Sequence, residues 1–152
     1  MNISSAAFTE GGMIPKKYTC DDKNVSPPLT FGDIPAGAKS LALIADDPDA
    51  PVGTWVHWVM YNIQPSTNSL PENMPPEKVL SSGARHGIND FRYIGYGGPC
   101  PPGGTHRYFF KLYALDTILD LSPGASKKDL LGDMRNHILA EASLMGKYKR
   151  QR

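Results

Sequence analysis

The sequence has little cysteine, no long apolar run and no excess of charge of one sign. Its 152 residues include two cysteines, Cys20 and Cys100, which are too few for a disulfide scaffold and which we expect to be reduced. Lysine and arginine number 16, aspartate and glutamate 15, and the formal net charge is +1. This balance argues against nucleic acid as the main partner, because binding a phosphate backbone requires a basic face.

Targeting and membrane signals are missing as well. Residues 1–15 have neither the basic start nor the apolar run of a signal peptide. No stretch approaches the roughly 20 apolar residues that cross a bilayer as a helix. We therefore expect no transmembrane segment and a cytoplasmic location.

The common signatures of catalysis and metal binding are also absent. Histidines and cysteines do not occur at the H-x-x-x-H or C-x-x-C spacings typical of zinc sites, and no G-x-S-x-G is present. The glycine-rich segment 95–104 lacks the G-K-[ST] of a phosphate-binding loop. A thiol nucleophile would have to be Cys100 beside His106, but the flanking prolines leave no helix N-terminus to activate it. We therefore predict no catalytic residue, no cofactor and no metal.

Glycine and proline are abundant, at 15 and 14 residues, and they argue against an all-helical protein. Residues 40–45, 55–63 and 105–115 are apolar runs of strand length. Such near-continuous runs indicate strands that are covered on both faces. Weaker strands are expected at 3–8, 25–31 and 80–85. We predict one domain, 1–152, that is mainly β: a two-sheet antiparallel β-sandwich with Greek-key connections and one or two peripheral helices.

One helix is predicted near the C-terminus. Ser126 and Asp129 form a capping-box pattern that marks its start. An apolar stripe at three- and four-residue spacing follows it: Leu130, Leu131, Met134, Ile138, Ala142 and Met145. Gly146 is a suitable C-terminal stop. We expect this helix to close the core.

The first candidate constellation is the acidic segment 46–51, which follows one strand and precedes the next. Its three carboxylates repel one another and need partners. The alternative is that the segment only forms a turn, because Asp and Pro are typical turn residues. On the next strand, period-two alternation puts Trp55, His57 and Val59 on one face and Trp58 on the other.

The second constellation is the glycine- and proline-rich segment 95–104, which leads into a strand. Alternation puts His106, Tyr108 and Phe110 on one face of that strand. Imidazole N–H, phenol O–H and loop N–H groups are donors, and donors that converge in a cleft favour an anion such as phosphate or carboxylate. The alternative is that the loop only turns the chain and that both side chains close a core.

Three motifs together resemble the phosphatidylethanolamine-binding protein family, and more narrowly its short, prokaryotic-type, Raf-kinase-inhibitor-like branch. They are D-P-D-A-P at 47–51, W-V-H-W at 55–58 and G-G-P-C-P-P-G-G-T-H-R-Y at 97–108. I-P-K-K-Y-T-C at 14–20 and N-V-S-P-P-L at 24–29 also fit. The resemblance implies a β-sandwich with peripheral helices and a small pocket for phosphate, phosphoryl head groups, acetate or similar anions.

The resemblance also implies a set of ligand-binding residues. They are Asp47, Asp49, Pro51, Trp55, His57, Gly98, Pro101, Pro102, His106 and Tyr108. In this set His57 and His106 face each other at the pocket floor, Tyr108 donates to the anion, and Asp47 orients an imidazole. It further places Cys100 at the pocket rim and Cys20 before a pocket-side loop, so that a Cys20–Cys100 bridge is a second hypothesis for the thiols.

We therefore predict a non-enzymatic binding protein that holds a small anionic or phosphorylated ligand and modulates a protein partner. The alternative is an inhibitor of a serine protease or kinase that acts through exposed loops such as 71–76. Segment 52–54 is short where eukaryotic members carry an insertion, so their kinase-contacting surface is not implied. The resemblance also allows for a homodimer.

Overall fold

The larger of two antiparallel sheets contains the strands that the long apolar runs predict. The computed structural model describes residues 1–150. The order of the five strands in this sheet is β6-β4-β3-β7-β8. Their bounds are β6 Arg85–His86, β4 Trp55–Ile63, β3 Ser40–Asp47, β7 His106–Leu115 and β8 Ile138–Tyr148. The strands predicted at 40–45, 55–63 and 105–115 are thus confirmed.

The smaller sheet has the order β1-β2-β5. Its strands are β1 Asn2–Ser4, β2 Leu29–Gly32 and β5 Ser69–Leu70, and a short 3₁₀ helix, η1, spans Lys16–Tyr18. The strands predicted at 3–8 and 25–31 are shorter than predicted. The strand predicted at 80–85 is wrong: residues 80–84 form a turn, in which the Gly83 N–H donates to the Leu80 carbonyl at 2.9 Å, and β6 begins only at Arg85. In β2 the prolines at 27 and 28 have no N–H to donate, so that regular pairing begins only at Leu29.

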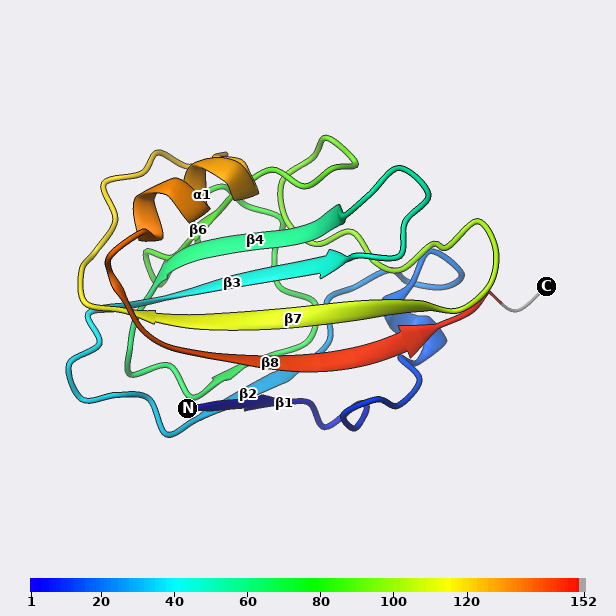
Figure 1. Ribbon diagram of the computed structural model, residues 1–152, viewed down its shortest axis with the longest axis horizontal. Coiled ribbons are helices and arrows are strands. Elements are labelled where there is room, and N and C mark those ends of the chain that lie inside the picture. Colours follow the sequence, from blue (N-terminus) through cyan, green and yellow to red (C-terminus); the bar gives the residue numbers. More distant parts are fainter. Residues whose placement is uncertain (151–152) are drawn as a thin grey trace.

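The connections of the larger sheet are of the Greek-key type, as predicted. β3 and β4 form a hairpin, and β4 pairs with β6. The chain then returns to place β7 on the other side of β3 rather than beside β6. This spatial order is that of a Greek key, with the fourth strand beside the first. It brings the turn between β3 and β4 and the start of β7, which are far apart in the sequence, to one end of the sheet (Figure 1).

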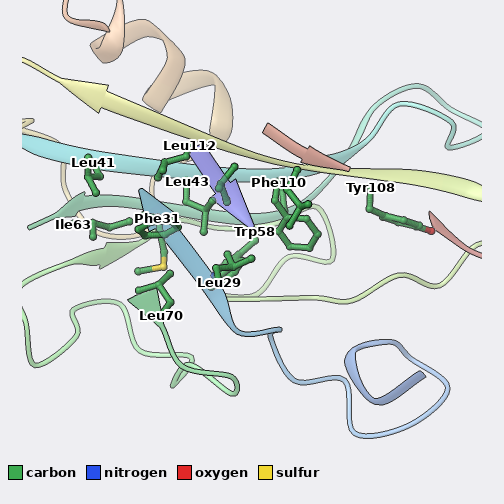
Figure 2. Close-up of a cluster of buried hydrophobic side chains, with 14 of the residues drawn as sticks. Leu29, Phe31, Leu41, Leu43, Trp58, Ile63, Leu70, Tyr108, Phe110 and Leu112 are labelled. Atoms are coloured by element: carbon green, nitrogen blue, oxygen red, sulfur yellow. The ribbon is translucent and has the colours of Figure 1, made fainter. Parts of the chain in front are cut away.

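The main core lies between the two sheets. Figure 2 shows its side chains converging from both sheets, with Leu29 and Phe31 on one side and Leu43, Trp58 and Phe110 on the other. These side chains are all nearly inaccessible to solvent. Burial of this apolar surface is the main favourable contribution to folding, at roughly 25 cal/mol for each Å² removed from water.

A second cluster covers the opposite face of the larger sheet. Helix α1, Lys127–Met134, places Leu130 and Met134 against Ile44 and Tyr61. Every residue of β3 is therefore buried, which confirms that its continuous apolar run marks a strand covered on both faces. No helix within residues 1–150 is long and apolar enough to cross a membrane.

The predicted C-terminal helix is correct at its start and wrong beyond Met134. The Ser126 hydroxyl accepts the Asp129 N–H at 3.1 Å, and the Asp129 carboxylate accepts the Ser126 N–H at 3.3 Å. The capping box is thus confirmed. The chain then turns through Asn136, at φ 69°, and continues as strand β8.

Pairing with β7 outweighs the helix-forming composition of this segment. β8 pairs with β7 along its length, from Tyr148 opposite His106 to Ile138 opposite Leu115. Alternate β8 side chains, Ala142, Leu144 and Tyr148 among them, contact the main core, so the period that matters is two and not 3.6. Gly146 is not a helix stop: a Cβ there would lie 2.6 Å from the Ile14 side chain, which packs across β8.

Candidate functional site

The pairing register places the candidate site at one end of the larger sheet. Asp46, near the end of β3, pairs with Val56 at the start of β4 and with Phe109 at the start of β7. The loops 48–54 and 98–105 therefore lie at the same end of the sandwich, on the right in Figure 1. Both constellations found in the sequence meet here.

A cavity of about 230 Å³ opens between these loops. Of the predicted site residues, its lining contains Asp47, Pro51, Trp55, His57, Pro101, Pro102, His106 and Tyr108. The lining also contains Ala50, Val52, Phe91 and Cys100. Asp49 and Gly98 lie outside it.

His106 and Asp47 form a buried pair on the cavity floor. The His106 Nδ1–H donates to Asp47 Oδ2 at 2.6 Å, and the other carboxylate oxygen accepts the Asp49 N–H at 2.7 Å. Both side chains are less than a tenth exposed. The carboxylate thus fixes the ring orientation and leaves Nε2 of His106 for the cavity.

A β-bulge directs His57 into the cavity. Ala45 pairs with Trp58 and Asp46 with Val56, so that β4 has one residue more than β3 at this point. Strict alternation, which puts His57 on the face of Val59, is therefore wrong here: Val59 belongs to the helix-side cluster. The His57 ring instead packs edge-on against Tyr108, with the centroids 5.2 Å apart. Bulges often redirect a side chain in this way next to binding sites.

The hydrogen bonds of His57 define its tautomer. Its Nδ1–H donates to the Gly97 carbonyl at 2.6 Å, which leaves a lone pair on Nε2. Burial lowers the pKa of His57 below its usual value, because the low-polarity surroundings disfavour the imidazolium. Neutral His57 is therefore an acceptor at Nε2, and it becomes a donor there when it is protonated.

Tyr108 carries a buried hydroxyl without a partner at the site. Within residues 1–150, its hydroxyl is the only fully buried side-chain polar atom without a hydrogen-bond partner. Figure 2 shows Tyr108 at the edge of the core cluster with its oxygen pointing away from the other labelled side chains. Burial raises the pKa of this phenol well above its usual value, and the carboxylates of Asp47 and Asp49 add to the effect. The hydroxyl therefore stays protonated and is available as a donor.

The two predicted residues outside the lining support the loops. Asp49 accepts three hydrogen bonds from Arg107, from the backbone N–H, Nε and a terminal nitrogen, at 2.8–2.9 Å. The guanidinium lowers the pKa of Asp49 to about 2. Gly98 donates its N–H to the Asn24 side chain at 2.8 Å, and a Cβ there would lie 2.3 Å from the Tyr18 carbonyl oxygen.

A disulfide joins Cys20 to Cys100, so the expectation of two reduced thiols is wrong and the bridge hypothesis is confirmed. The Cys20 N–H also donates to the Pro99 carbonyl at 3.1 Å. The bridge thus fastens the proline-rich wall of the cavity to the segment around η1. The expectation of reduced thiols assumed a cytoplasmic location, because disulfides are rare in the cytoplasm. The location itself stays a prediction.

Sequence reasoning missed Phe91 at the site. Phe91 lies against both Trp55 and His57, with ring centroids 5.5 and 5.4 Å away. It follows Asn89 and Asp90, which signal a turn but do not reveal what the next residue contacts. His86, for which the sequence indicated no role, is buried in the core outside the cavity lining; it accepts the Trp58 indole N–H at 3.0 Å and contacts the Glu77 carbonyl oxygen at 2.8 Å. Both of its ring nitrogens are occupied, so His86 is structural.

These features define a class: a β-sandwich with a small cavity, lined by two histidines, at one end of its larger sheet. The family model described as phosphatidylethanolamine-binding protein matches residues 4–149, and the chain belongs to this family. Its relatives place it among the prokaryotic-type members. This is in general a non-catalytic binding family.

The relatives match over nearly the whole chain. A UPF0098 protein of Methanothermobacter thermautotrophicus is 56% identical over 99% of both chains. A crystal structure of a putative phosphatidylethanolamine-binding protein homologue from Chlamydia trachomatis is 44% identical, with a TM-score of 0.92 over 99% of this chain and 97% of that one. YbcL of Escherichia coli is 33% identical, with a TM-score of 0.87 over 99% and 98%. The predicted sandwich fold is thus confirmed.

Proposed function

We propose that this protein is a non-enzymatic binding protein whose pocket holds the phosphoryl or carboxylate group of a small anion. The buried, unpartnered hydroxyl of Tyr108 carries the proposal. A buried polar group without a partner costs roughly 1–3 kcal/mol, and such groups are rare in native proteins. A ligand oxygen in the cavity would supply the missing acceptor.

The two imidazoles complete a set of groups suited to an anion. With Nδ1–H of His106 bound to Asp47, a proton on Nε2 turns the ring into a donor toward the cavity, and the carboxylate balances its charge. His57 accepts a protonated ligand oxygen when neutral and donates when charged. The ligand thus meets up to three polar groups on the floor of a pocket with apolar walls, an arrangement typical of binding sites.

The same contacts favour binding over catalysis. Cys100, the candidate nucleophile, is held in the disulfide and has no thiol to ionise. The carboxylates of Asp47 and Asp49 already accept hydrogen bonds from His106 and Arg107, respectively. No activated nucleophile and general base therefore face each other across the cavity.

Calorimetric titration with inorganic phosphate tests the proposal. We expect saturable binding with a dissociation constant between about 1 µM and 1 mM, the range for a few hydrogen bonds that compete with water. His106→Gln should weaken it at least tenfold. His137→Gln is the matched control, because His137 also bonds a carboxylate, that of Asp116 at 2.8 Å, but lies outside the pocket lining. No saturable heat, or equal affinities for both variants, would refute the proposal.

The inhibitor alternative has weaker support. Segment 71–76 is bonded to its neighbours: the Glu72 carboxylate contacts Lys17 and Tyr18, and the Asn73 N–H donates to the Ser26 carbonyl at 2.9 Å. A loop held in this way is less free to enter a protease cleft. Incubation with a panel of serine proteases tests the protease half of this alternative, and unchanged rates would count against it. Modulation of a protein partner and a homodimer likewise stay predictions.

A further inference from the structure

A second cavity, of about 330 Å³, opens between the two sheets. Strands β4 and β5 contribute to its floor, segment 71–77 forms its first wall, and the turn 80–84 forms its second wall. Figure 2 shows two of its lining residues, Ile63 and Leu70, at the opposite end of the core cluster from Tyr108. It shares no lining residue with the first cavity. Its volume lies in the range of small-molecule sites, roughly 300–1,000 Å³.

Core side chains form the floor of this second cavity. Its apolar floor residues are each less than a tenth exposed: Met60, Ile63, Leu70, Leu80 and Ala84. Protein interiors are normally packed as densely as organic crystals, so a core surface that faces a cavity lacks contacts that a ligand would restore. Met74 lines the same space as Met60. Methionine side chains are flexible and polarisable, and they adapt to ligands of varied shape.

Hydrogen bonds hold both walls of the cavity in place. In the first wall, the Met74 N–H donates to the Ser26 hydroxyl at 2.9 Å. In the second wall, the Leu80 N–H donates to the Ala84 carbonyl at 2.8 Å. The cavity is therefore preformed, and a ligand enters it without the cost of ordering a loop.

Glu77 is the one ionisable residue of the lining. Its carbonyl oxygen contacts the His86 ring at 2.8 Å, which fixes the backbone, whereas its exposed carboxylate makes no ion pair or hydrogen bond with another described residue. The neighbouring basic residues do not occupy it: Lys78 is exposed and outside the lining, and the Arg85 guanidinium donates to the Leu121 carbonyl at 2.6 Å. The cavity thus combines an apolar floor with one unpaired negative charge.

We propose that this second cavity binds amphiphilic amines, in which an alkyl or aryl group carries an ammonium group. The apolar group lies on the floor beside the methionines, and the ammonium group pairs with the Glu77 carboxylate. A fatty acid would place its own carboxylate beside that of Glu77, and the lining has no cation to balance it. The inference goes beyond the proposed function and does not depend on it, because the two cavities have no residue in common.

Calorimetric titration with four small probes at neutral pH tests the proposal. Hexylamine should bind about threefold more tightly than hexan-1-ol, as expected for a solvent-exposed ion pair, and about tenfold more tightly than hexanoate. It should also bind about tenfold more tightly than butylamine, because two further methylene groups leave water. Saturating phosphate should leave the affinity for hexylamine unchanged.

Two variants connect this binding to the second cavity. Glu77→Gln should lower the affinity for hexylamine to that for hexan-1-ol and leave the alcohol unaffected. Glu141→Gln is the matched control, because Glu141 is also exposed and outside any ion pair between described residues, but lies on β8 away from the lining. Ser81→Phe places a ring at the cavity opening from an exposed turn position and should weaken the binding of hexylamine and of hexan-1-ol at least tenfold.

The outcomes keep this inference separate from the proposed function. If hexylamine does not bind, or binds no more tightly than hexan-1-ol, hexanoate or butylamine, the inference is refuted whether or not phosphate binds. Loss of hexylamine binding in His106→Gln or with saturating phosphate would place the amine in the first cavity and refute the second site. Unchanged hexylamine affinity in both Glu77→Gln and Ser81→Phe refutes it as well. Failure of phosphate to bind refutes the proposed function alone.

Discussion

Asp46 and Asp47 are neighbours in β3 and almost equally buried, yet they lie in very different surroundings. Asp46 faces the helix side, where its carboxylate contacts the ammonium groups of Lys111 and Lys127 at 3.1 and 2.8 Å. Asp47 faces the cavity, and its partner His106 keeps one ring nitrogen free. A buried carboxylate therefore does not by itself mark a site. A site is indicated when the hydrogen-bond partner of the carboxylate, here His106, still has a free polar atom at the cavity.

The same contrast holds for buried tyrosines and histidines. On the helix side, the Tyr61 hydroxyl donates to the Ser122 carbonyl and accepts the Ala125 N–H. In the pocket, the Tyr108 hydroxyl has no partner. The core histidine His86 has both ring nitrogens occupied, whereas His57 has one. The buried tyrosine on the helix side and the core histidine thus have hydrogen-bond partners for all their polar atoms, whereas Tyr108 and His57 in the pocket do not.

The largest expected effect comes from the disulfide, which has no counterpart on the helix side. Replacing Cys20 and Cys100 together by serine opens a loop of 80 residues, and we expect a loss of about 4 kcal/mol in the free energy of unfolding. Phosphate binding should weaken severalfold, because the proline-rich wall loses its anchor. Denaturant unfolding and calorimetry measure the two effects.

Chemical reduction provides the control for that prediction. A dithiol reductant should destabilise the parent protein to a similar extent and leave the double variant unchanged. An unfolding midpoint that does not respond to the loss of the bridge would show that the remaining contacts are sufficient to hold the wall.

The two aspartates give the next largest effect. Asp46→Asn should lower the free energy of unfolding by roughly 2 kcal/mol, because two partly exposed lysines lose a buried counter-charge, and should leave phosphate binding unchanged. Asp47→Asn should cost less stability, since an amide oxygen still accepts from His106, but should weaken phosphate binding about tenfold. Calorimetry measures the phosphate affinity of both variants. An equal loss of affinity in both would contradict the assignment of Asp47, and not Asp46, to the pocket.

Acidification should destabilise the protein through its buried histidines. Burial holds the pKa of His57 and of His86 below the usual value of about 6.5. Below pH 6.5 the unfolded chain therefore binds more protons than the native one, and stability falls as the pH decreases, by at most about 1.4 kcal/mol for each group and pH unit. Stability above pH 7 should not depend on these groups.

Sulfate, which does not titrate in this range, distinguishes the two histidines. It should bind more tightly as the pH falls, because protonated His57 can donate to it, and should offset part of the loss in stability. The offset should persist in His86→Gln and shrink in His57→Gln. Sulfate affinity that is constant between pH 5 and 8 would contradict the role of His57.

The main strands and the two separate constellations could be predicted from the sequence because their signals are local, whereas their meeting in one pocket was implied only by the family resemblance. The run at 40–45 is apolar on both faces, and alternation along β7 places His106 and Tyr108 together without interruption. The position of His57 could not be derived in this way, since the bulge arises from the pairing of β4 with β3.

Strand β8 and Phe91 escaped prediction because distant parts of the chain determine both. The segment 138–148 suits a helix by composition and becomes a strand only because β7 offers a long edge for pairing. Phe91 reaches the cavity through a loop that is fastened to β4, where the Asp90 carboxylate accepts the Val56 N–H at 2.7 Å. Pairing partners of this kind are not encoded in the spacing of nearby residues.

The smallest expected effect is the most specific, because removal of two similar hydroxyls should change stability in opposite directions. Tyr108→Phe removes an unpartnered buried hydroxyl and should raise the free energy of unfolding without ligand by about 1 kcal/mol. Tyr61→Phe removes a hydroxyl that makes two hydrogen bonds and should lower it by a similar amount. Only Tyr108→Phe should weaken phosphate binding, because its hydroxyl is the donor left free for the anion. Denaturant unfolding with and without phosphate measures both quantities, and a loss of stability in Tyr108→Phe would mean that the hydroxyl has a partner in the free protein.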